Sequence, residues 1–139
     1  MKSKAFFLLI ALLAAAAWAE PAGPRDDPIA KAVFPPELVM KYSQEINLDE
    51  RQRTAIKENV QKAQSKFVDV QFELQTESQK LARLLQAKPA DEAAVLSQVD
   101  KVLALEREVK RTQIALVVRI KNLLTDAQQA KLMDLRRQE

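Results

Sequence analysis

The sequence predicts an all-α protein in which two long antiparallel helices form a hairpin and two short helices flank it. Apolar residues recur at steps of three and four along two long stretches, and Pro89 separates these stretches. Gly23 is the only glycine, so the positive-φ turns that β-hairpins favour are nearly unavailable. The chain also has no cysteine, so its stability must come from packing or oligomerisation rather than from disulfides.

Residues 1–19 have the three parts of a secretory signal peptide. Lys2 and Lys4 form a basic start, and an uninterrupted apolar run follows from Ala5 to Ala17. Small residues on both sides of Trp18 suit signal peptidase, so we expect cleavage after Ala19 and, in a bacterium, a periplasmic protein. An uncleaved N-terminal anchor is the alternative, although the apolar run is short for a membrane span.

Loss of the signal peptide would leave a nearly neutral chain. Without Lys2 and Lys4, 20 basic residues stand against 19 acidic ones, for a net charge of +1. Such a nearly neutral chain lacks the excess of basic residues that indicates nucleic-acid binding. Residues 20–33 are rich in proline and charge and are predicted to be a flexible leader, followed by a single helical domain over residues 34–139.

The first half of the domain contains a short helix and a long one. The short helix is predicted from Pro36 to about Glu45, with Asn47 interrupting the chain before the long helix, which runs from Asp49 to about Lys88. The long helix has an apolar seam with strict four-three steps: Ile56, Val60, Ala63, Phe67, Val70, Leu74, Glu77, Leu81 and Leu84. Such a 3.5-residue repeat is typical of a helix packed lengthwise on another.

The second half repeats this pattern after Pro89. A third helix is predicted from near Ala90, and a short final helix from Asp126 to about Arg137. The seam of the third helix is Val95, Val99, Val102, Glu106, Val109, Gln113, Leu116, Ile120 and Leu123. Two such seams joined by a turn should fold into a hairpin, and a 40-residue helix would be about 60 Å long, so an elongated domain is expected.

Polar residues on the two seams have two interpretations. Glu77, Glu106 and Gln113 either are buried groups that set the register or lie where the hairpin opens. Met40 and Met133 are predicted to fill gaps in the core rather than to bind metal.

The third helix carries two further apolar features. Ile114–Val118 is apolar on all sides of the helix, which predicts burial by the short helices and by a second chain in a homodimer. A second stripe mixes apolar and charged residues: Asp100, Leu103, Arg107, Lys110, Ile114, Val117 and Lys121. Val68 and Phe72 also stand off the seam of the second helix. These residues are either a surface that holds a client or partner, or an ordinary core boundary or dimer contact.

The sequence lacks the residues that most catalytic sites use. Without cysteine or histidine there is no thiol nucleophile and no imidazole base, and a single glycine cannot form a phosphate-binding loop. Paired carboxylates such as Asp91 and Glu92 lie at helix starts, where the helix dipole favours negative charge. We therefore expect a protein that is not an enzyme and has no cofactor, no metal site and no small-molecule substrate.

Two short phrases open the second and the fourth helix. They are Leu48-Asp49-Glu50-Arg51-Gln52 and Leu124-Thr125-Asp126-Ala127-Gln128. Each predicts a capping box, in which Asp49 or Thr125 accepts a backbone N–H and the glutamine, Gln52 or Gln128, returns a bond to the cap.

This pair of phrases resembles the repeated LTxxQ signature of the periplasmic CpxP/Spy family, which also includes ZraP-like and CnrX-like heavy-metal sensors. The first phrase has Asp49 where the family often has Thr or Ser. The resemblance implies a four-helix hooked hairpin that often pairs into a dimer. It also implies an ATP-independent chaperone or envelope-stress adaptor, whose partners are exposed hydrophobic protein segments or a membrane signalling protein.

A heavy-metal sensor or resistance subunit that signals to a membrane partner is the alternative that the same resemblance implies. The metal ions of that branch prefer imidazole and thiolate ligands, whereas this chain offers carboxylates, amides and thioethers.

Overall fold

The computed structural model describes residues 27–139, so the signal peptide expected at residues 1–19 lies outside the described part of the chain. All elements of residues 27–139 are helices: α2 (Pro28–Ala32), α3 (Pro36–Lys41), α4 (Glu50–Gln86), α5 (Glu92–Leu123) and α6 (Asp126–Arg137). The chain divides into two units, one ending at Ala32 and one running from Val33 to Glu139. Helix α2 belongs to the first unit and falls within the stretch expected to be a leader. No helix in residues 27–139 is long and apolar enough to cross a membrane.

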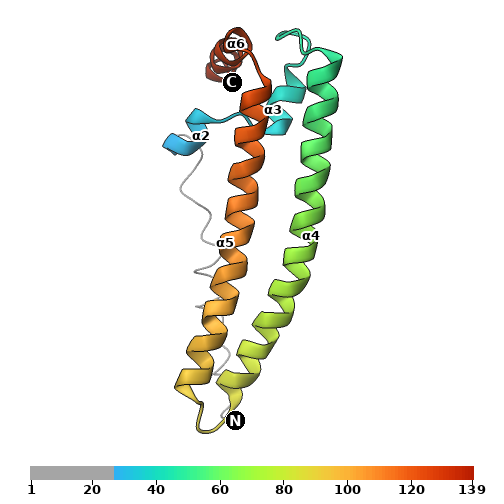
Figure 1. Ribbon diagram of the computed structural model, residues 1–139. Coiled ribbons are helices and arrows are strands. Elements are labelled where there is room, and N and C mark those ends of the chain that lie inside the picture. The colour runs from blue at the N-terminus through green and yellow to red at the C-terminus, as the bar shows by residue number, and fades with distance from the viewer. Residues whose placement is uncertain (1–26) are drawn as a thin grey trace, which may run out of the picture. The chain divides into compact units, whose positions relative to one another are not determined.

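The unit from Val33 to Glu139 is built on the expected hairpin. Helices α4 and α5 run side by side in opposite directions and are joined around Pro89 (Figure 1). The seam predicted for α4 is the covered side of that helix, with Ile56, Ala63 and Val70 buried and the other seam residues half-buried. The prediction of an all-α fold with two long packed helices is therefore confirmed.

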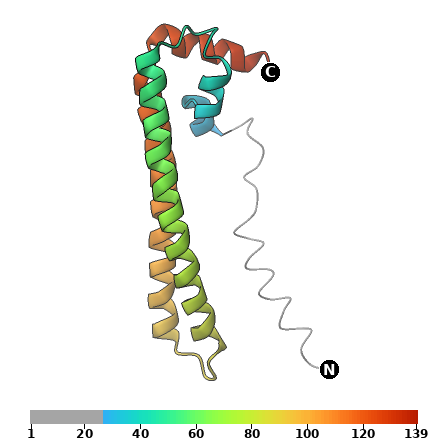
Figure 2. The same cartoon turned by 90° about the vertical axis from the view of Figure 1, so that its right-hand side faces the viewer.

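The hydrophobic core lies at one end of this hairpin. Helix α6 crosses the end away from Pro89, next to α3 (Figure 2). The core residues come from α3, from α6, from the connections and from the adjoining ends of α4 and α5. They are Phe34, Val39, Ile46, Leu48, Ile56, Ile120, Leu124 and Leu132. Away from this end, within the unit from Val33 to Glu139, α4 and α5 have only each other to pack against, so fewer of their apolar side chains are covered.

Helix α3 is shorter than predicted. It ends at Lys41, and the chain turns through residues 42–47 instead of continuing to Glu45. Asn47 has a φ of 51°, a left-handed conformation that asparagine tolerates better than most residues. This turn brings Ile46 and Leu48 into the core, and their burial outweighs one more turn of helix.

The seam predicted for α5 is wrong in its middle. Glu106 and Gln113 are exposed, whereas Gln98, which the predicted seam omits, is only 6% exposed. The apolar members of the series around these two, Val102, Val109 and Leu116, are half-buried, so only the polar side chains, which would be costly to bury unpaired, lie off the contact line. Leu105 and Thr112 are half-buried in place of the two expected polar residues.

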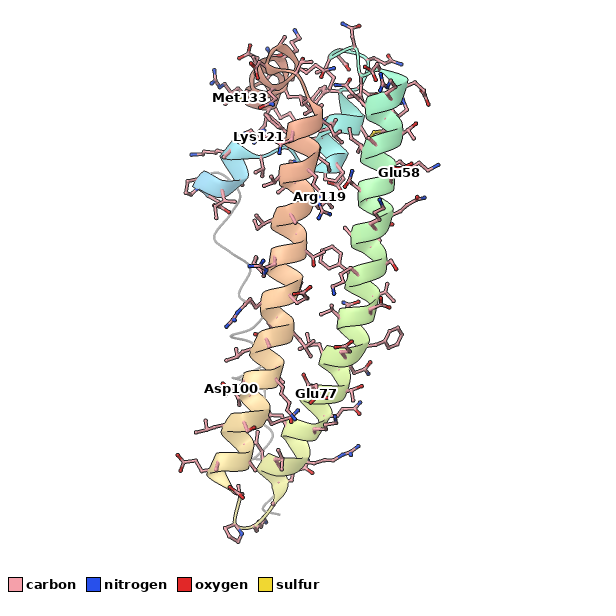
Figure 3. The ribbon with its side chains drawn as sticks, viewed as in Figure 1. Glu58, Glu77, Asp100, Arg119, Lys121 and Met133 are labelled. Atoms are coloured by element: carbon pink, nitrogen blue, oxygen red, sulfur yellow. The ribbon has the colours of Figure 1, made fainter. Side chains whose placement is uncertain are left out.

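Glu77 is the polar seam residue that does join the two long helices. It lies in the half of the hairpin nearer Pro89 (Figure 3), and Gln98 Nε2 donates to its carboxylate at 2.6 Å and to its backbone carbonyl at 2.8 Å. Lys80 Nζ lies 2.6 Å from the same carboxylate. The hydrogen bonds from Lys80 and from Gln98 lower the pKa of Glu77 below its ordinary value.

The two methionines predicted to fill the core are exposed instead. Met40 and Met133 are each 42% exposed. Each follows a fully buried residue in its helix, Val39 in α3 and Leu132 in α6. Consecutive helical side chains point about 100° apart, which turns both methionines away from the core.

Candidate functional site

Both predicted capping boxes are present. Asp49 Oδ1 accepts the backbone N–H of Gln52 at 2.8 Å, and Gln52 Oε1 accepts the N–H of Asp49 at 3.1 Å. At the start of α6, Thr125 Oγ1 accepts the N–H of Gln128 at 3.2 Å, and Gln128 Oε1 accepts the N–H of Thr125 at 2.9 Å. Each box satisfies two backbone donors that the first helical turn would leave unpaired.

The two capping glutamines also bind each other, and we call this pair the glutamine clasp. Gln52 Nε2 donates to Gln128 Oε1 at 2.7 Å, and Gln128 Nε2 donates to Gln52 Oε1 at 3.0 Å. The remaining amide hydrogens are used as well, by the carbonyl of Leu123 at 2.8 Å and that of Ile46 at 3.2 Å. The clasp therefore ties the start of α4 to the start of α6, directly beside the buried Leu48 and Leu124.

A second set of contacts holds α6 and the residue Glu139 after it to the segment before α3 and to the end of α3. Arg136 Nη2 donates to the Val33 carbonyl at 2.8 Å, and the guanidinium lies 5.1 Å from the centre of the Phe34 ring. Glu139 accepts hydrogen bonds from Lys41 and from the Tyr42 hydroxyl. These two bonds lower the pKa of the Glu139 carboxyl, and the bond to Glu139 raises the pKa of Lys41.

The residues predicted to form a client or partner surface divide into three sets. Val68, Phe72, Leu103 and Ile114 are exposed apolar side chains, Arg107 and Lys110 are exposed cations, and Val117 and Lys121 are half-buried. Lys110 and Ile114 come together at the groove described next, and the other six do not line it. None of these positions tests the predicted role, which remains a prediction.

A groove of about 660 Å³ opens between the two long helices. It is lined by Lys62, Ala63 and Lys66 of α4 and by Glu108, Lys110, Arg111, Thr112, Ile114, Ala115, Val118 and Arg119 of α5. The small side chains Ala63 and Ala115 leave room between the helices, and Lys66 pairs with Glu108 at 3.2 Å across the groove. We call it the cationic groove, because five of its residues are basic and one is acidic.

This combination of groups can hold a partner that is apolar in part and negatively charged in part. Ile114 and Val118 supply exposed apolar surface, while flexible cationic side chains such as Lys62 and Arg119 can adapt to carboxylates. Figure 3 labels Arg119 on α5. Sequence reasoning missed Lys62, Lys66, Arg111 and Arg119. The spacing of Lys62 and Lys66 by four residues, and of Arg111 and Arg119 by eight, could have placed each pair on one helix face.

The fold and the groove thus define an all-α protein with a helical hairpin and a cationic surface between its long helices. A family model described as heavy-metal resistance matches residues 5–131, and the chain belongs to this family. No curated protein and no solved structure matches it.

The residues of this chain do not fit a tightly bound heavy-metal ion, although the family description suggests one. Borderline metals such as Zn²⁺ and Ni²⁺ favour imidazole and thiolate, and the sequence contains no histidine and no cysteine. Among residues 27–139, no three acidic side chains come together as an all-carboxylate site would require. The cationic groove also repels divalent cations.

Proposed function

We propose that this protein is a periplasmic, non-enzymatic binding protein of the CpxP/Spy type, acting as an ATP-independent chaperone or envelope-stress adaptor. The observation that carries this proposal is the cationic groove, in which exposed apolar side chains lie among basic ones. An unfolded polypeptide offers apolar side chains together with carboxylates, and both find partners there. The repeated capping phrases support the same assignment, and membership of the heavy-metal resistance family is compatible with it.

Binding without catalysis agrees with the chemistry of the chain. Among residues 27–139, the carboxyls of Glu77 and Glu139 have a shifted pKa, and in both the pKa lies below the ordinary value. Hydrogen bonds hold them ionised, whereas a general acid at neutral pH needs a raised pKa. The absence of cysteine and histidine from the sequence removes the commonest nucleophile–base pairs.

Export to the periplasm is proposed from the signal-peptide pattern of residues 1–19. An exported protein in an ATP-free compartment must hold its partners by contact alone. A groove on a hairpin of two long helices suits that task because it needs no conformational cycle to expose the binding residues.

A heavy-metal sensor that signals to a membrane partner is the second candidate, and the family description favours it. Its weakness is the donor set, since the chain would have to bind metal through carboxylates, amides and the exposed thioethers of Met40 and Met133.

The test is suppression of aggregation. The chain without residues 1–19 is added to a chemically denatured client protein, and light scattering is followed with EDTA, with Zn²⁺ and with Ni²⁺. We expect suppression that is independent of metal. The double substitution Lys62→Glu and Arg111→Glu should raise the concentration needed for half-suppression several-fold, because both changes reverse charges in the groove.

Arg83→Glu is the matched control, since Arg83 is an exposed cation of α4 outside the groove. It should leave suppression unchanged. Failure of the wild-type chain to suppress aggregation under any condition would rule out the chaperone function. Suppression that requires metal would favour the sensor instead.

A further inference from the structure

Most of the positive charge of the cationic groove is not neutralised by neighbouring side chains. Lys66 is paired with Glu108, the one acidic residue of the lining. The other four basic residues of the groove take part in no ion pair within residues 27–139: Lys62, Lys110, Arg111 and Arg119. The groove is therefore a local excess of positive charge, and it can accept more than one negatively charged group.

The pair of Lys66 and Glu108 shows which residues of the two long helices lie at the same level. Helices α4 and α5 are antiparallel, so one turn back along α4 corresponds to one turn forward along α5. Lys62, one turn before Lys66, therefore lies close to the level of Arg111. Arg119 lies eight residues further along α5, a distance of about 12 Å along the helix axis. The groove thus has two cationic levels about 12 Å apart.

The surface between the two cationic levels is apolar. The burial predicted for Ile114–Val118 is only partial in the single chain, because Ile114 and Val118 are exposed and the three residues between them are half-buried. Ile114, Ala115 and Val118 line the groove. The groove therefore presents cations, then apolar side chains, then a cation along its length.

The groove has the cross-section of an extended chain rather than that of a helix. Its lining runs from Glu108 to Arg119, so a volume of about 660 Å³ over about 16 Å of helix gives a mean cross-section of about 40 Å². A strand in packed sheets occupies about 4.8 Å by about 10 Å, or about 48 Å². A helix with its side chains is about 10–12 Å across and occupies about 80–110 Å².

We infer that the cationic groove prefers extended segments in which two carboxylates stand four residues apart, with an apolar residue midway between them. In an extended chain the side chains at i, i+2 and i+4 point to one side, and residues i and i+4 are about 13 Å apart. One carboxylate meets Lys62 and Arg111, and the other meets Arg119. The apolar residue at i+2 lies against Ile114 and Val118. This inference deepens the proposed function, on which it rests, by naming the sequence that the groove selects in its partners.

Other spacings of the two carboxylates fit the groove less well. Carboxylates two residues apart in an extended segment span only about 7 Å, so they cannot be level with both cationic ends at once. Carboxylates eight residues apart span about 26 Å, which exceeds the length of the groove. The long side chains of lysine and arginine can adapt to some misfit, so the preference for a spacing of four should be several-fold rather than absolute.

The test measures the binding of short peptides to the chain without residues 1–19 by NMR titration, which follows weak binding. Two end-capped peptides of seven residues have the same composition: a central valine, two glutamates and four serines. The glutamates occupy the second and sixth positions of one peptide and the third and fifth positions of the other. The peptide with a spacing of four should bind about three- to five-fold more tightly, because it alone gains a second charge pair.

A charge reversal in the groove tests whether Arg119 reads the second carboxylate. Arg119→Glu changes an exposed residue and should abolish the preference for a spacing of four. A third peptide, with lysine in place of one of the two glutamates spaced by four, should bind this variant more tightly than it binds wild type, because its lysine pairs with the new carboxylate. Arg83→Glu, the same charge change outside the groove, is the matched control and should keep the preference.

Equal affinity of the wild-type chain for the two glutamate peptides overturns the inference, and so does binding of neither peptide at about 1 mM. A loss of affinity in Arg119→Glu that is equal for both peptides also overturns it, because that loss reports net charge alone. The aggregation assay described above separates this result from the proposed function. A chain that suppresses aggregation without a preference for spacing keeps the proposed function and loses this inference. A chain that prefers a spacing of four but suppresses no aggregation keeps the specificity of the groove and loses the chaperone function.

Discussion

At the scale of single residues, the glutamine clasp shows why the capping phrase occurs twice. One capping box needs only a glutamine three residues after the cap. Here the oxygen of each amide also accepts from the other glutamine, and its two hydrogens go to the other glutamine and to a backbone carbonyl, that of Leu123 or Ile46. Glutamate could not replace either residue with the same effect, because it has no amide hydrogens to donate.

Loss of one glutamine should therefore cost more than loss of an ordinary cap. Gln128→Ala removes the bonds to Thr125, Gln52 and Ile46, and we expect a loss of about 2–4 kcal/mol in the free energy of unfolding, because partners are left unpaired at a half-buried site. Urea denaturation measures this loss. Gln138→Ala, at an exposed position, should stay within about 0.5 kcal/mol of wild type.

The double substitution of Gln52 and Gln128 by alanine completes this test. If the two amides act as a pair, the double variant should lose less stability than the sum of the single variants, by about 1 kcal/mol or more. Strictly additive losses would contradict the clasp and leave two independent caps.

Some hydrogen bonds of these residues could be predicted from the sequence, and others could not. The capping boxes could be predicted because each one joins residues three apart in the sequence. The bond between Gln52 and Gln128 could not, because it joins residues 76 apart and depends on how α6 meets the hairpin.

At the scale of elements, the apolar periodicity of the sequence predicted the covered residues of α4 better than those of α5. In α4 the series has one polar member, Glu77, and all of its members are buried or half-buried as far as Leu84. In α5 the two polar members, Glu106 and Gln113, are exposed, and the preceding residues, Leu105 and Thr112, are half-buried instead. Gln98 was missed because its burial depends on an acceptor, Glu77, that belongs to the other helix.

The bond between Gln98 and Glu77 predicts a pH dependence of stability. Hydrogen bonds from Lys80 and from Gln98 lower the pKa of Glu77 in the folded chain below its ordinary value of 4.5. The stabilisation is therefore present above the unfolded pKa and is lost as the pH falls through the folded pKa. Glu77→Gln should be less stable than wild type near pH 7, and the difference should vanish in acid.

Urea denaturation midpoints between pH 7 and pH 2 measure this convergence, and a carbon-13 NMR titration of Glu77 measures the pKa itself. Glu58→Gln removes an exposed carboxylate elsewhere on α4 (Figure 3) and controls for the loss of one negative charge. A Glu77 pKa at or above its ordinary value would contradict the assigned cause.

At the scale of the whole unit from Val33 to Glu139, the fold was predictable and the groove was not. The single glycine, the missing cysteines and the two interrupted apolar series are enough to require helices that pack on each other. The cationic groove depends on the rotation of α4 relative to α5, which decides whether Lys62 and Arg111 face the same space. A helical series fixes which residues share a face but not which face of the neighbouring helix they meet.

The composition of the whole chain gives the last prediction, which concerns metal. A ligand that binds only the folded state adds about 2.7 kcal/mol of stability when present at one hundred times its dissociation constant. The chain has no imidazole and no thiolate, so we expect no such stabilisation by Zn²⁺ or Ni²⁺. At 100 μM metal, about one hundred times a micromolar dissociation constant, the midpoint of thermal unfolding should equal the midpoint in EDTA within about 1 °C. Ser97→His with Lys101→His places two imidazoles one turn apart on exposed positions of α5 and should raise the midpoint in metal, which shows that the assay can detect binding. A wild-type midpoint that rises with metal as that of the histidine variant does would mean that carboxylates and thioethers suffice in this chain, and would move its function toward metal sensing.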